Sequence, residues 1–123
     1  MIDPSYSPLQ LVGEVKDGYE PIWSLIKNDL AITREDFSNL IGYHRNSVRL
    51  WEQKLEQIPL LYKQYWESGP RSKYLDWYQI LVLTIVAFIK KDYRGHSIVR
   101  VLRTFATRLD RNTLKEVVKY VQF

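Results

Sequence analysis

Cysteine is absent from this sequence of 123 residues, which holds only one methionine and two histidines. The chain therefore has no disulfide, no thiolate metal site and no cysteine nucleophile. His44 and His96 lack the spacing that zinc ligands have with each other or with carboxylates. A phosphate-cradling glycine loop, a nucleophile elbow and a paired-carboxylate signature are also missing. We expect a protein that is not an enzyme and that uses no metal or cofactor.

Long hydrophobic runs are missing as well. The longest, Tyr78–Ile89, is interrupted by Gln79 and is too short to span a bilayer, so it predicts a buried helix. The first thirty residues are acidic and lack the apolar core of a secretory leader. We expect a cytoplasmic protein without a membrane partner.

Charge is unevenly distributed along the chain, whose net charge is +4. Residues 1–32 hold two basic and five acidic side chains, whereas residues 90–119 hold nine basic and three acidic ones. This asymmetry favours a polyanionic partner that is met from one side. A solvated basic helix face is the alternative, and it is a frequent one.

The stretch 33–52, TREDFSNLIGYHRNSVRLWE, carries the strongest pattern. It predicts a helix from about Arg34 to Ile41, capped by Thr33, and a second helix that starts near Arg45. Gly42 lies between them, where a sharp turn needs a left-handed backbone. Each helix has apolar residues for packing: Phe37, Leu40 and Ile41 in the first, and Val48, Leu50 and Trp51 in the second.

The outward face of the second helix is polar and basic. In a helix-turn-helix such a face enters the DNA major groove, so we predict base contacts by Arg45, Asn46 and Arg49. His44 and Ser47 lie at the helix start and are predicted to contact phosphate. A helical hairpin in a small bundle would show the same pattern, and His44 could serve only as a cap.

On either side of this unit the sequence predicts an arm and a wing. Residues 1–20 contain two prolines and two glycines without a sustained period, which predicts an arm with little regular structure. Leu60–Trp66 and Arg71–Tyr74 flank a turn signal and predict a β-hairpin wing. The wing would place Lys63, Arg71 and Lys73 against phosphate. The alternative is a helix through Leu60–Trp66.

The last third predicts three helices. Asp76 can cap the buried helix Trp77–Lys91, Ser97 can start an amphipathic one, and Thr113–Val121 forms the last. The apolar side chains of the last helix are predicted to form the interface of a homodimer: Leu114, Val117, Val118 and Val121. The domain prediction is an arm at 1–20, a DNA-binding unit at 21–91 and C-terminal helices at 92–123.

In its order of elements the chain resembles the DNA-binding domain of MerR-type transcription regulators. Ser47–Glu52 reads SVRLWE where that family has a phrase like TLRYWE, and Gly69–Tyr74 reads GPRSKY where its wing ends in a GYRxY-like phrase. Gly95–Ile98 matches the G-x-S that opens a later helix. In size and layout the chain is similar to the small repressors linked to cyanobacterial CRISPR-associated transposons. The long dimerising helix of MerR proteins and any effector domain are missing.

The resemblance implies a mainly α, winged helix-turn-helix fold and a homodimeric repressor that binds double-stranded DNA without a small-molecule effector. Two alternatives remain at this point. Residues 45–52 are equally similar to a phage-repressor helix-turn-helix, and a protein–protein adaptor could use the same scaffold.

Overall fold

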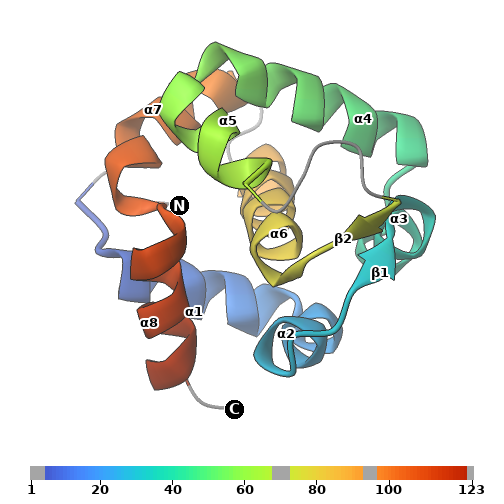
Figure 1. Cartoon of the computed structure of the whole chain (residues 1–123), viewed down its shortest axis with the longest axis horizontal. Helices are drawn as coiled ribbons and strands as arrows, with labels where there is room; N and C mark the ends of the chain where they lie inside the picture. The colour runs from blue at the N-terminus through green and yellow to red at the C-terminus, as the bar shows by residue number, and fades with distance from the viewer. Residues whose placement is uncertain (1–4, 68–72, 93–96, 122–123) are drawn as a thin grey trace.

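An apolar helix, α6 (Trp77–Asp92), runs through the middle of the computed structural model, which describes residues 5–67, 73–92 and 97–121. Every side chain from Tyr78 to Ala87 is buried. A helix that is apolar on all sides must be covered on all sides, and the other helices surround it (Figure 1). The predicted buried helix is confirmed.

The described residues form eight α-helices and one two-stranded sheet. The elements that precede β2 and the central helix α6 in the sequence are α1 (Pro8–Gly18), α2 (Glu20–Lys27), β1 (Ile32–Thr33), α3 (Arg34–Ile41), α4 (Arg45–Lys54) and α5 (Pro59–Tyr65). After β2 (Tyr74–Leu75) and α6 come α7 (Ile98–Phe105) and α8 (Arg111–Tyr120). Two short 3-10 helices, Leu55–Gln57 and Ala106–Arg108, extend α4 and α7. The mainly helical fold class is confirmed.

The predicted arm is wrong, because most of it is the helix α1. Ser7 accepts a hydrogen bond from the Gln10 amide, and the Gln10 side chain accepts one from the Ser7 amide, which together make a capping box. Leu11, Val12 and Val15 are buried against the core. Helix α1 lies beside α8 and α6 (Figure 1), so it belongs to the folded body.

The helix-turn-helix has the predicted boundaries. Thr33 Oγ1 accepts from the Asp36 amide at 3.1 Å and caps α3. Gly42 ends α3 with a φ of 76°, the left-handed conformation that glycine adopts without steric cost. The next helix, α4, starts at Arg45 as expected.

The predicted hairpin is wrong in its first strand. Residues 59–65 form the helix α5, the alternative interpretation. Pro59 occupies the first turn, where its missing N–H costs nothing, and Leu61 and Tyr65 share the buried face one turn apart. Of the predicted second strand, Arg71–Tyr74, only Tyr74 lies in a described strand: β2 consists of Tyr74 and Leu75, and it pairs with β1, which precedes the helix-turn-helix. The strands are antiparallel, with Ile32 opposite Leu75 and Thr33 opposite Tyr74.

The C-terminal helices start at capping residues. Ser97 caps α7 as predicted. Asp110 accepts from the Thr113 amide and caps α8, so this helix begins two residues earlier than expected. The other end of α8 is tied to α2, because Lys27 Nζ donates to the carbonyls of Val118 at 2.9 Å and Val121 at 3.1 Å.

Substitution of two leucines on α1 measures how much the packing of this helix contributes to stability. Leu11 is fully buried, whereas Leu9 is 49% exposed. We expect Leu11→Ala to lower the free energy of unfolding by about 2–5 kcal/mol, because it leaves a cavity in the core. Leu9→Ala should change it by less than about 0.5 kcal/mol. Urea unfolding of both variants measures the difference, and equal small effects would show that α1 is not part of the cooperative core.

Candidate nucleic-acid interface

Helix α4 has one buried side and one solvent-facing side. Val48 and Trp51 lie in the core, and Tyr43 packs edge-on against Trp51 with ring centroids 5.1 Å apart. Arg45 and Arg49 are exposed. The predicted base-contact residues, these two and Asn46, are therefore all accessible to a ligand that lies along α4.

One residue on the side of α4 that faces away from the core was predicted to be packed and is exposed instead. Leu50, expected to pack beside Trp51, is 55% exposed. Each residue turns an α-helix by about 100°, which places Leu50 about 160° from Val48. The same geometry places Asn46 and Gln53 beside it, opposite the buried side. Leu40 of α3, also predicted to pack, is 48% exposed.

His44 caps α4. Its Nδ1 accepts a hydrogen bond from the Asn46 amide at 3.1 Å, which is the capping role that the sequence left open. Ser47 is half-buried in the first turn. Phosphate contact by either residue stays a prediction.

A groove lies between the start of α3 and the side of α4, and it brings four cations together. Its volume is about 510 Å³. We call it the cationic groove; its lining residues are Thr33, Arg34, Glu35, Asp36, Arg45, Arg49 and Lys73. Lys73 reaches it because β2, the next two residues, pairs with β1 at the start of α3. The groove thus combines part of the predicted base-contact and phosphate-contact sets.

Of the other two predicted wing cations, only Lys63 lies within the described residues, and it is not among the residues that line the groove. Lys63 is exposed on the helix α5, because the strand predicted for it does not form. Arg71 lies outside the described residues. The predicted wing is therefore wrong in its secondary structure, because its first strand is a helix. It is also wrong for Lys63, which lies on that helix.

A carboxylate at the end of α4 joins the helix-turn-helix to α5. Glu52 accepts from Arg34 through both of its oxygens, at 2.7 Å and 3.0 Å, and from the Tyr65 hydroxyl at 2.6 Å. Burial, and then the negative charge of Glu52, raise the pKa of Tyr65 well above its usual value. The hydrogen bond with Glu52 raises the pKa of Arg34. We call this set of three residues the Glu52 junction.

A second groove begins on the other side of Arg34 and Arg49. It has a volume of about 480 Å³ and lies between α4 and α5. Tyr62 and Trp66 supply aromatic surface, with the Arg34 guanidinium 5.7 Å from the centre of the Trp66 ring. The two arginines therefore separate a cationic groove from an aromatic one.

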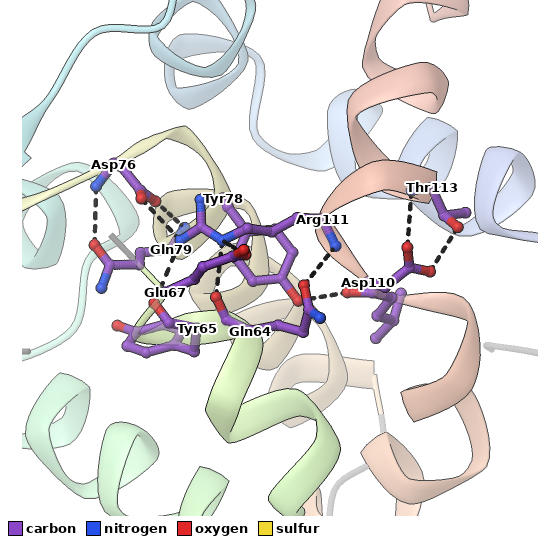
Figure 2. Close-up of polar contacts among 10 residues, drawn as sticks. Gln64, Tyr65, Glu67, Asp76, Tyr78, Gln79, Asp110, Arg111 and Thr113 are labelled. Atoms are coloured by element: carbon purple, nitrogen blue, oxygen red, sulfur yellow. Dashed lines mark hydrogen bonds and ion pairs between the residues drawn. The ribbon is translucent and has the colours of Figure 1, made fainter. Parts of the chain in front are cut away.

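Behind these grooves, Arg111 joins α8 to the α5–α6 region (Figure 2). Its guanidinium donates to the Gln64 carbonyl at 2.8 Å and to Asp76 at 2.9 Å, and it lies 4.6 Å from the centre of the Tyr78 ring. It also pairs with Glu67 at 3.2 Å. Only 16% of the Arg111 side chain is exposed, so this part of the basic C-terminal charge serves the fold.

The predicted dimer residues divide into two groups. Leu114 is fully buried within the chain, and Val121 is 8% exposed. Leu114 is therefore a core residue and has no surface to offer a second copy. Val117 and Val118 are half-buried. Val118 borders a hollow of about 180 Å³ that Ile26 and Trp77 also line.

Within the described parts of the chain, no three His, Cys, Asp or Glu side chains are grouped as metal ligands would be. The described helices also include none with the length and apolar character needed to cross a membrane.

The Glu52 junction predicts a pH-dependent contribution to stability. Tyr65→Phe removes a hydroxyl that donates to a carboxylate, so we expect it to lower the free energy of unfolding by about 1.5–3 kcal/mol at pH 8. Above about pH 10 the unfolded tyrosine loses its proton while the folded one, with its raised pKa, keeps it. The wild type then loses stability that the variant never had, and the gap should narrow.

Denaturant unfolding at pH 8 and pH 11 measures this gap. Tyr120→Phe is the matched control, because the Tyr120 side chain is 73% exposed and should contribute less than about 0.5 kcal/mol. A gap that stays constant over this range would mean that Tyr65 titrates alike in both states.

No family model, no curated protein and no solved structure matches this chain, so the MerR-type resemblance stays a prediction from sequence.

Proposed function

We propose that this protein is a sequence-specific DNA-binding repressor that acts as a homodimer. The observation that carries the proposal is the exposed face of α4, which is polar and basic and borders the cationic groove. Its opposite side is anchored by Val48 and Trp51 and by the Glu52 junction. A rigidly held helix with this surface suits the DNA major groove.

In this proposal α4 lies in the major groove. Arg45, Asn46 and Arg49 meet base edges, since arginine pairs with guanine and asparagine with adenine through two hydrogen bonds. Lys73, at the edge of the cationic groove, meets the phosphate backbone. The net charge of +4 is modest, so the gathering of four cations at the cationic groove matters more than the total.

The homodimer is proposed because one helix-turn-helix contacts too few base pairs for useful specificity. The half-buried Val117 and Val118, with the hollow beside Val118, support contact through α8. Tyr120, 73% exposed on the same helix, adds apolar surface. Repression without an inducer is part of the proposal because it is what the MerR-type resemblance implies.

A protein–protein adaptor is the second candidate. The observation in its favour is the exposure of two leucines in the helix-turn-helix, Leu40 at 48% and Leu50 at 55%. Salt dependence separates the two functions, because only DNA binding releases counterions from a polyanion.

We expect Arg49→Ala and Lys73→Ala to weaken DNA binding in different ways. Losing a base contact at Arg49 should cost roughly 1–3 kcal/mol on the cognate site and little on scrambled DNA. Losing a phosphate contact at Lys73 should weaken binding to every sequence and reduce the slope of log K against log salt by about one.

Competition binding with cognate and scrambled duplexes over a salt series measures both effects. Equal losses on the two duplexes for Arg49→Ala would make Arg49 a phosphate contact and would contradict its assigned role. If the wild type binds no DNA, the repressor proposal fails and the adaptor remains.

We expect the double substitution Val117→Glu, Val118→Glu to convert the dimer into a monomer, because two carboxylates cannot be buried unpaired in an interface. Sedimentation measures the mass, and circular dichroism establishes whether the variant is folded. Asn112→Glu, an exposed position on the same helix, is the charge control and should stay dimeric. A folded double variant that remains dimeric would place the interface elsewhere.

A further inference from the structure

Three neighbouring side chains form the outermost stripe of α4: Asn46, Leu50 and Gln53. They are spaced four and three residues apart, so they are adjacent on the helix surface. Arg49 flanks the stripe on one side and Lys54 on the other, and both are exposed. An apolar residue thus lies between two amides and is framed by cations.

The chemistry of this stripe matches one kind of base pair. Asparagine and glutamine form paired hydrogen bonds with the N6 and N7 atoms of adenine. Leucine forms none, and the one apolar group that DNA presents in its major groove is the C5 methyl of thymine. An A·T pair offers both features side by side.

We propose that α4 selects A·T pairs, with Leu50 against a thymine methyl and with Asn46 or Gln53 on a neighbouring adenine. This inference rests on the proposed DNA-binding function and gives Leu50 a specificity-determining role. Leaving a leucine 55% exposed at the centre of a polar face forgoes the stabilisation of burial in the free protein. Contact with a methyl group would recover part of it in the complex.

The two flanking cations differ in their roles in this arrangement. In a helix that lies in the major groove, the outermost residues meet the bases and those at the sides are nearer to the two backbones. Arg49 borders the cationic groove, while Lys54 is on the opposite side of the stripe. The stripe therefore selects the A·T pair and Arg49 keeps its proposed contact with a neighbouring base edge, while Lys54 supplies affinity that is sensitive to salt.

The experiment begins with selection of bound duplexes from a randomised double-stranded DNA pool by the full chain. Each thymine of the selected site is then replaced by uracil, which keeps the base pair and removes only the methyl group. We expect A·T pairs in the selected core, and at least one uracil replacement that weakens binding about four-fold, the effect of one buried methyl group.

The same replacement is then measured with two leucine variants. Leu50→Ala should weaken binding to the thymine site by a similar factor and should bind the thymine and uracil sites equally. Leu9→Ala is the matched control, since Leu9 is a leucine of similar exposure, 49%, on α1. It should retain the affinity and the thymine preference of the wild type.

Three results would overturn the inference: a selected core of G·C pairs, uracil replacements without effect, or a Leu50→Ala variant that still discriminates thymine from uracil. A Leu50→Ala variant that sediments as a monomer while the wild type is a dimer would also overturn it, because Leu50 would then belong to a protein interface. If the pool yields no bound duplex at any salt concentration, the proposed function itself fails, and that outcome is distinct from the others.

Discussion

The need to cover α6 on all sides determines the arrangement of this molecule. A 16-residue helix whose side chains are buried from Tyr78 to Ala87 cannot lie at a surface, and no single partner helix can enclose it. Helices from both ends of the chain therefore pack around it: α1 and α2 from the start, α3 to α5 from the middle, and α7 after it. The helix-turn-helix is thus one part of a shared core, and its orientation is fixed by the same burial that holds the fold together.

Polar junctions connect helices that are already held together by apolar packing. The Glu52 junction ties α4 to α3 and α5, and Arg111 ties α8 to the same α5 and to the start of α6. Both use a charged group with several hydrogen-bond partners, which is the condition under which a buried or half-buried charge is tolerated. Neither set of contacts involves the outer face of α4, where Asn46, Leu50 and Gln53 are exposed.

Local signals in the sequence are sufficient for the helix-turn-helix, and they are insufficient for features that depend on contacts between distant residues. Thr33, Gly42 and Asp76 each predicted a boundary correctly, because caps and left-handed turns depend on nearest neighbours. Helix α1 was predictable from Ser7 and Gln10, a capping box directly before apolar residues at helical spacing. The pairing of β1 with β2 joins residues about forty positions apart, and no local pattern indicates it. In the candidate site the accessible arginines were predicted, whereas the exposure of Leu50 required the structure.

The two hydrogen bonds from Lys27 to the end of α8 have a geometric consequence. Lys27 ends α2, and β1, which leads directly into α3, begins five residues later. In a dimer formed through α8, this short connection would determine how far each α4 lies from the symmetry axis. The separation of the two half-sites on DNA, ordinarily one helical turn of about 34–36 Å, would then be set at the α2–α8 joint. Changes at that joint would alter which operator spacings are tolerated while leaving every base contact in place.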